Sequence, residues 1–195
     1  YLEKKEEDKS KEKYGHTLMA LVNAYDEGLL AFPTHRMIMQ SSISSQDLLQ
    51  KLQKHFYIQA FSMAENKEEL RALLEKSLTG ATEEKLCMGL YTPEKKFYLL
   101  TIKDLKKEER PFPWLDTVII QELVLQDIFE LDEDDRKKGS FLSYIRDEWE
   151  AKRQVDQGKV FYFFFLNKSP LEEIINLAEQ GIRMPQKSTY FFPKL

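Results

Sequence analysis

Residues 160–166 read Val-Phe-Tyr-Phe-Phe-Phe-Leu, an uninterrupted run of apolar and aromatic side chains. A strand with one wet face alternates polar and apolar residues, whereas an unbroken run predicts a strand that is covered on both faces. We therefore expect this strand at the centre of a sheet. Ser169-Pro170-Leu171-Glu172 follows it and predicts a helix start, with Ser169 as the N-cap and Glu172 completing a capping box.

The segments around this strand predict a sheet with helices packed on it. Residues 17–25 and 29–38 flank a turn sequence at 26–28, and residues 87–91 and 97–102 flank another at 92–95, so both pairs predict antiparallel hairpins. Pro33 places the second segment at an edge or a bulge. Further segments have helical or strand patterns: helices at 45–56, 66–80, 115–131, 147–155 and 169–181, and strands at 57–62, 141–145 and 189–192. The predicted fold class is α+β, with a mixed β-sheet, antiparallel hairpins and packed helices.

The composition predicts a soluble cytoplasmic protein. The chain has 195 residues, a net charge of −4 and one cysteine, Cys87, which excludes an internal disulfide and suggests a reducing compartment. No apolar run approaches the roughly 20 residues of a membrane-spanning helix. A net negative chain does not favour nucleic acid or a membrane as a partner. The three histidines are far apart and have no neighbouring ligands at metal spacing, so we expect no metal site.

The chain is expected to form one domain. Residues 1–15 are highly charged and predict an N-terminal arm or a helix end, and residues 16–195 predict a single α+β domain. Residues 103–113 are polar and contain two prolines, so they form either a linker between subdomains or a long surface loop. The first residue is not Met, and the charged pattern of the first residues is that of an exposed helix entered part-way, so we expect that sequence precedes this chain.

Two stretches without acidic residues stand out in this acidic chain. The first contains Thr34, His35 and Arg36, and the second, residues 181–195, contains Lys187, Ser188 and Thr189. Arginine, lysine and hydroxyl groups are suited to phosphate or carboxylate oxygens, so the pattern predicts a site for an anionic small molecule or a nucleotide. The alternative is that these residues are an ordinary sheet edge and solubilising charges near a chain end.

The same two stretches carry a resemblance to a known family. "GLLAFPTHRM" and "MPQKSTYFFPKL" resemble two motifs of the bacterial and archaeal family called domain of unknown function 1015. Members of that family carry an upstream Asp-Gly-His-His-Arg-type motif, which looks like the phosphate-binding signature of the partition-protein B and sulfiredoxin superfamily. Some members of that superfamily are small-molecule kinases, including free-serine kinases. The present sequence has no such motif. For the motifs that are present, the resemblance implies ligand-binding roles for Thr34, Arg36, Gln186, Lys187, Ser188 and Thr189.

Two functional hypotheses follow. In the first, the chain is the C-terminal part of a phosphate-ligand enzyme such as an amino-acid kinase, with Arg36 and Lys187 neutralising phosphoryl charge and His35 as the one nearby candidate for a general base. In the second, it is a non-catalytic binding or scaffold domain. The sequence defines neither the substrate, nor a cofactor, nor the oligomeric state.

Overall fold

The computed structural model describes residues 21–62, 64–78, 86–103, 115–132, 135, 139–185 and 187–192. Its strands are β1 (Leu30–Phe32), β2 (His35–Ile38), β3 (Phe56–Ser62), β4 (Cys87–Tyr91), β5 (Lys96–Ile102), β6 (Leu142–Ile145), β7 (Tyr162–Phe165) and β8 (Tyr190–Phe192). Its helices are α2 (Ser45–Leu52), α3 (Lys67–Leu78), α4 (Asp116–Ile119), the π-helix η3 (Ile120–Gln126), α6 (Glu148–Asp156) and α7 (Leu171–Glu179). Several predictions fall on residues outside the described ranges. These are residues 1–20, the seam predicted at 103–113 except for Lys103, the helix stop at Gly80 and the site residue Gln186.

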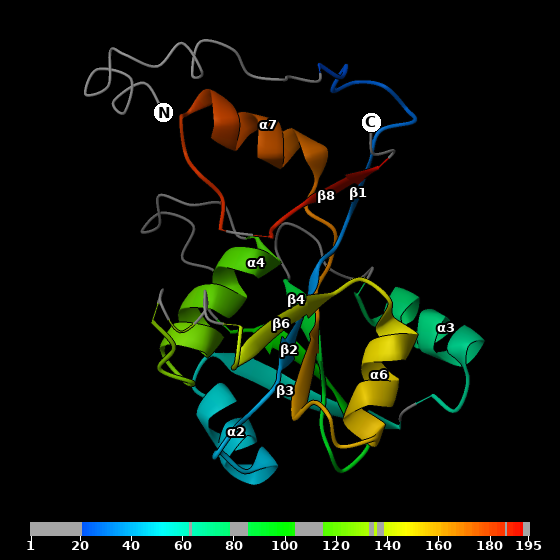
Figure 1. Ribbon diagram of the computed structural model, residues 1–195, viewed down its shortest axis with the longest axis vertical. Helices are drawn as coiled ribbons and strands as arrows, with labels where there is room; N and C mark the ends of the chain where they lie inside the picture. Colours follow the sequence, from blue (N-terminus) through cyan, green and yellow to red (C-terminus); the bar gives the residue numbers. More distant parts are fainter. Residues whose placement is uncertain are drawn as a thin grey trace, which may run out of the picture.

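Six strands form one sheet in the order β3-β5-β4-β7-β2-β6, and β1 and β8 form a separate two-stranded sheet (Figure 1). The α+β class is confirmed. Every pairing between the described strands is antiparallel, which is more uniform than the mixed sheet that the sequence predicted. β7 lies between β4 and β2, in the interior position expected from its sequence.

Helices cover both faces of the six-stranded sheet. Tyr162 and Phe164 of β7 belong to a core with residues of α2 and η3, whereas Phe163 and Phe165 belong to a core with residues of α3 and α6. Successive side chains of a strand point to opposite faces, so a strand that lies between two helical layers must be apolar at every position. This arrangement explains the four apolar residues of β7, whereas Phe161, which directly precedes the strand, is 41% exposed.

The first predicted hairpin is wrong. The turn forms as expected, with the N–H of Leu29 donating to Asp26 O, but residues 21–25 are not a strand. β1 pairs with β8 instead, and β2 pairs with β6 and β7. Pro33 separates two strands that belong to different sheets. The local turn pattern could not show that both strands have partners from much later in the chain.

Three predicted helices differ in detail from the observed ones. The helix predicted at 45–56 ends at Leu52, and Phe56 begins β3 instead. Residues 115–131 form a short α-helix followed by the π-helix η3, whose wider turn is not visible in apolar spacing. Helix α7 has Pro170 as its N-cap, without a side-chain cap, and the predicted N-cap Ser169 is buried one residue earlier. Within the described residues, no helix is both long and apolar enough to cross a membrane.

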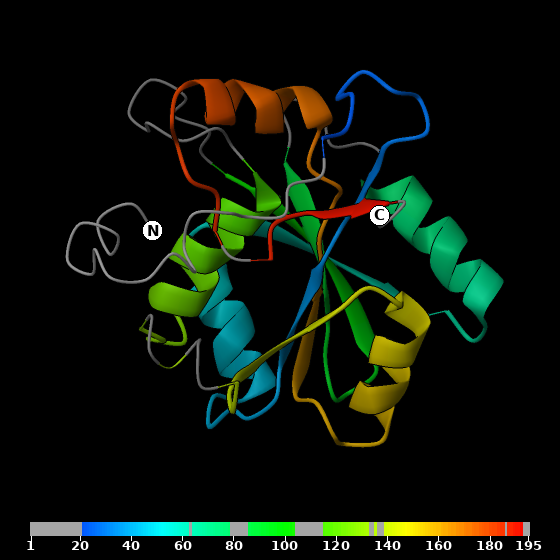
Figure 2. The same ribbon diagram turned by 45° about the horizontal axis from the view of Figure 1, so that its top comes forward.

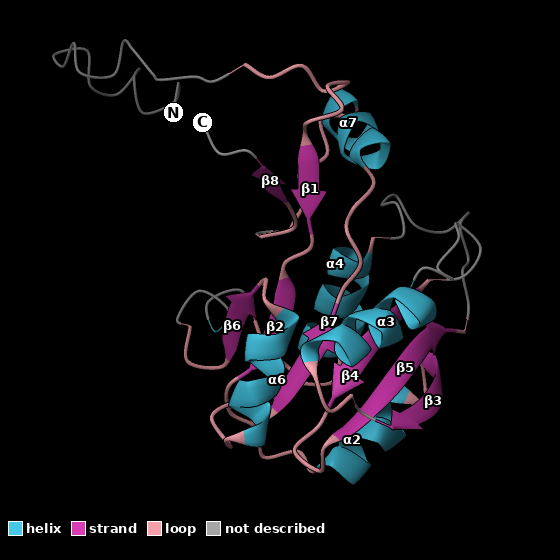
Figure 3. Cartoon of the chain, turned by 90° about the vertical axis from the view of Figure 1, so that its right-hand side faces the viewer, coloured by secondary structure: helices cyan, strands magenta, loops and turns pink. Residues whose placement is uncertain are grey.

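Helix α7 and the β1–β8 pair lie together beyond one end of the large sheet (Figures 1 and 3), and Figure 2 turns this end toward the viewer. A small apolar cluster joins α7 to α4 there, with Leu115 and Val118 on one side and Leu177 on the other. We call β1, β8 and α7 the cap. The predicted site residues 187–189 directly precede β8, so the position of the cap decides where the candidate site lies.

Candidate functional site

The β1–β8 pairing brings the two predicted motifs together. Leu30 pairs with Phe192 and Phe32 pairs with Tyr190, so Thr34 and Ser188 leave the ladder at the same end. The rings of Phe32 and Phe192 meet edge to face at 6.1 Å. The pairing thus places the acid-free stretch near residue 35 beside the acid-free stretch near residue 188.

His35 is a buried residue with partners at both ring nitrogens. Its side chain is 2% exposed, and its ring lies against Phe163 and Phe165, with centroids 5.6 and 5.9 Å away. The backbone N–H of Leu166 donates to Nδ1 at 3.0 Å, which leaves the proton of a neutral ring on Nε2. Nε2 lies 3.3 Å from Glu148 Oε1.

This hydrogen bonding bears on the proposed role of His35 as a base. Neither nitrogen has a free lone pair facing solvent, so the geometry suits a residue that fixes the start of β2 better than one that takes a proton from a substrate. Partial burial alone would raise the pKa of Glu148, but the hydrogen bond from His35 helps to hold that pKa below its usual value. Glu148 is 40% exposed and remains reachable from solvent.

Arg36 is equally buried, at 2% exposure. Its Nη1 donates to the carbonyl oxygen of Thr34, and its guanidinium lies 4.8 Å from the ring centroid of Tyr144. Burial lowers the pKa of Arg36 to about 10, so the side chain stays charged at neutral pH. Its charge acts on the site mainly through the field, because solvent barely reaches it.

The second motif combines an exposed cation with an inward hydroxyl. Lys187 is exposed and adopts φ 57°, in the left-handed region. Ser188 is 5% exposed, and its hydroxyl donates to Pro185 O at 2.6 Å. Thr189 is half-buried.

Arg146 is a cation at this place that the sequence did not single out. It directly follows β6, and its guanidinium lies 3.9 Å from the ring centroid of Tyr190 in β8. Both Arg146 and Lys187 are exposed, so they can meet an anion that approaches from solvent. The sequence could not reveal this neighbour, because only the fold brings the end of β6 beside the cap.

A buried carboxyl group lies at the same end of the sheet. Asp116 is 6% exposed and accepts hydrogen bonds from the backbone N–H and the side-chain Nδ2 of Asn167, at 2.6 and 2.8 Å. Burial, with a smaller contribution from the nearby Glu173, raises the pKa of Asp116 to about 6 against the effect of the Asn167 bonds. Asn167 also donates to Cys87 O at 2.7 Å, so this network ties α4 to the ends of β7 and β4. The sequence analysis missed Asp116, because nothing in its local sequence marks it as buried.

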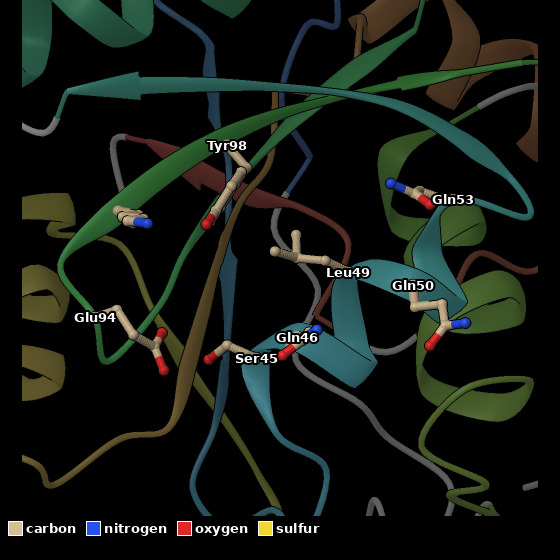
Figure 4. Close-up of a pocket in the computed structure, with 8 residues that line it drawn as sticks. Ser45, Gln46, Leu49, Gln50, Gln53, Glu94 and Tyr98 are labelled. Carbon is tan, nitrogen blue, oxygen red and sulfur yellow. The ribbon is translucent and has the colours of Figure 1, made fainter.

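Possible metal ligands and a cavity among the described residues also bear on where a ligand could bind. Across the described part of the chain, no group of three His, Cys, Asp or Glu side chains is placed to hold a metal ion. A cavity of about 620 Å³ lies between α2 and β5, and the predicted site residues are absent from its lining (Figure 4).

Comparisons with known proteins identify the fold. A family model described as "Protein of unknown function (DUF1015)" matches residues 1–119. A conserved hypothetical protein from Pyrococcus furiosus has a similar structure, with a TM-score of 0.51 and 16% identity over 88% of this chain and 60% of that one. A free serine kinase in complex with AMP matches with a TM-score of 0.52 and 16% identity, over 88% of this chain and 57% of that one. The chain thus spans somewhat more than half the length of these two structures. No curated protein matches it.

Proposed function

Because this chain belongs to the DUF1015 family of proteins of unknown function, we propose that it binds a phosphate-bearing ligand, in the first instance a nucleotide. The similarity of its fold to that of a free serine kinase in complex with AMP supports this proposal. The single observation that carries this proposal is the β1–β8 ladder, which unites the Thr34–Arg36 and Lys187–Thr189 motifs. The finer proposal is that this site serves a small-molecule kinase whose substrate is an amino acid.

The charges at the cap suggest how such a ligand is held. Lys187 and Arg146 are exposed, and in this proposal they contact the phosphate oxygens directly. The buried Arg36 adds positive electrostatic potential from inside the protein. The hydroxyl of Thr189 supplies a further polar group, and Gln186, which lies outside the described residues, keeps the ligand-binding role that the sequence predicted. We assign His35 a positioning role, because its bond with the Leu166 N–H holds the start of β2 beside Arg36.

A second candidate, a non-catalytic scaffold domain, is favoured by one observation. The hydroxyl of Ser188 and the guanidinium of Arg36 already donate to the carbonyl oxygens of Pro185 and Thr34. Side chains that are satisfied within the protein stabilise a fold without needing a ligand.

The decisive experiment measures melting temperature with AMP, ADP, ATP, phosphoserine and sulfate, for the parent chain and two variants. Lys187→Ala removes the exposed charge, and Lys95→Ala is its matched control, because Lys95 is also exposed and has φ 58°. A ligand that binds the folded state raises the melting temperature. We expect a nucleotide to stabilise the parent and the Lys95 variant, and to stabilise the Lys187 variant much less.

Phosphoryl transfer to serine is tested separately from nucleotide binding. Phosphorus NMR of the protein with serine and either ATP or ADP would show phosphoserine if the finer proposal holds, with less product from the Lys187 variant. Nucleotide binding without product supports the binding site and rejects the kinase. Absence of any thermal shift, together with a large loss of stability in Lys187→Ala, supports the scaffold.

A further inference from the structure

The cavity between α2 and β5 is a second potential site, remote from the cap. It lies beside the turn that joins β4 to β5, and this turn is at the opposite end of those strands from Cys87, where the Asn167–Asp116 network is attached. Its volume of about 620 Å³ is within the range of roughly 300–1,000 Å³ that small-molecule pockets occupy. An inference from this cavity therefore does not depend on the proposed function.

Three glutamines line the cavity along one side of α2. Gln46, Gln50 and Gln53 are four and three residues apart, a spacing that puts them on one helix face. All three are exposed, and within the described residues the structure gives their side-chain amides no hydrogen-bond partner. A carboxamide donates and accepts at once, as does a peptide group, so such a row is complementary to a peptide backbone.

The spacing of these carboxamides fits an extended chain. The helical rise places Gln46 and Gln50 about 6 Å apart along the axis. Alternate residues of an extended chain are about 6.6 Å apart. A short peptide that lies along α2 would therefore meet a carboxamide at about every second residue. Leu49 points from between these glutamines into the cavity, opposite Tyr98 of β5, and provides an apolar surface there (Figure 4).

A fixed negative charge closes one end of this row. The Glu94 carboxylate faces Ser45 at the start of α2 (Figure 4). Partial burial would raise the pKa of Glu94, but the hydroxyl of Ser45 and the positive charge of Lys96 are among the groups that hold it below its usual value. The carboxylate is thus ionised at neutral pH and still exposed, as a partner for an ammonium group must be.

We propose that this cavity binds the free amino-terminal end of a short, extended peptide. Glu94 binds the terminal ammonium group, the carboxamides of Gln46 and Gln50 pair with peptide groups, and a small apolar side chain of the peptide contacts Leu49. Lys96, the cation in the lining, disfavours a basic residue next to the terminus.

The test uses tetra-alanine amide and its N-acetylated form, titrated into the isotopically labelled protein while the side-chain amide signals of glutamine are followed by NMR. Free tetra-alanine amide is expected to shift the signals of Gln46, Gln50 and Gln53 and to bind about fivefold or more tightly than the acetylated peptide, because only the former carries the ammonium charge. Changing the ligand rather than the protein keeps this comparison independent of folding.

Two variants locate the site. Gln50→Ala should weaken binding, whereas Gln126→Ala, which removes an exposed glutamine at the end of η3, should leave it unchanged. Glu94→Gln should abolish the preference for the free terminus. Equal affinity for the two peptides, no shift at millimolar concentration, or equal shifts with free alanine would each overturn the proposal. The last outcome would assign the cavity to amino acids rather than peptides.

Discussion

At the scale of single residues, Asp116 is the most informative group. Its carboxyl is buried at the end of the sheet nearest the cap, and its pKa is raised to about 6. An unfolded aspartic acid has a pKa of about 3.9. The folded protein therefore binds this proton more tightly than the unfolded chain does, and the free energy of unfolding falls as the pH rises from about 4 to about 6.

Asp116→Asn is expected to abolish this fall in the free energy of unfolding with rising pH. The variant keeps an oxygen that can accept from Asn167 but cannot ionise, so its stability above pH 6 should exceed that of the parent by up to roughly 3 kcal/mol, with little gain below pH 4. Urea unfolding at several pH values measures the difference. Asp127→Asn is the contrasting control. A hydrogen bond from His55 and the neighbouring Lys54 lower the pKa of Asp127. Removing the Asp127 carboxylate should therefore reduce the free energy of unfolding near pH 6. Parallel pH curves for the parent and Asp116→Asn would contradict the assignment.

At the scale of the element, strand β4 depends on one glycine. A Cβ added to Gly89 would lie 2.7 Å from Phe97 Cε2 and 3.0 Å from Phe165 Cδ2. Both rings are completely buried, at 0% exposure, so they have no free space into which to move. β4 lies between β5 and β7, and the absence of a side chain at Gly89 allows these rings to pack across it.

Gly89→Ala should therefore destabilise the protein by about 1–3 kcal/mol through overpacking. Chemical unfolding measures the loss. Gly28→Ala is the matched control, since its nearest contact is the side-chain oxygen of Asp26 at 3.1 Å in an exposed turn, and its effect should stay within about 0.5 kcal/mol. Equal effects of the two substitutions would mean that the rings around Gly89 can rearrange.

The elements also show what the sequence can predict. Elements whose periodicity or turn chemistry is local were predictable from the sequence. They are the β4–β5 hairpin, β3, β6, α2, α3 and α6. The partners of β1 and β2 and the π-helix were not, since they depend on distant pairing and on hydrogen bonding that leaves no apolar signature. In the candidate site the motif residues were identifiable, whereas Arg146 and Asp116 became neighbours of the site only through the fold.

At the scale of the whole molecule, the cap and the sheet are held by apolar clusters of different size. The sheet has extensive apolar cores on both faces, whereas the small cluster around Leu177 joins α7 to α4. Regions with few buried apolar contacts open with a lower free energy than the global unfolding reaction. The cap should thus be the less stable part of the molecule.

Leu177→Ala tests this difference. Leu177 is 2% exposed, and its truncation should cost the cap about 2–5 kcal/mol. Hydrogen exchange should then accelerate in β1, α7 and β8 and stay nearly unchanged in β4, β5 and β7. Asn176→Ala, an exposed change in the same helix, is the control. Uniform acceleration throughout the chain would show that cap and sheet unfold as one unit.

The strand order also has a consequence for synthesis on the ribosome. β2 ends at Ile38, yet its neighbours in the sheet are β6, which begins at Leu142, and β7, which begins at Tyr162. A nascent chain can complete the β3-β5-β4 ladder once residue 102 has been made, but the partners of β2 among the described strands follow only with residues 142–165. β1 waits longer still, because its partner β8 begins only at Tyr190. Because all four residues of β2 are buried in the folded sheet, β2 is the segment that a growing chain must shield from premature association.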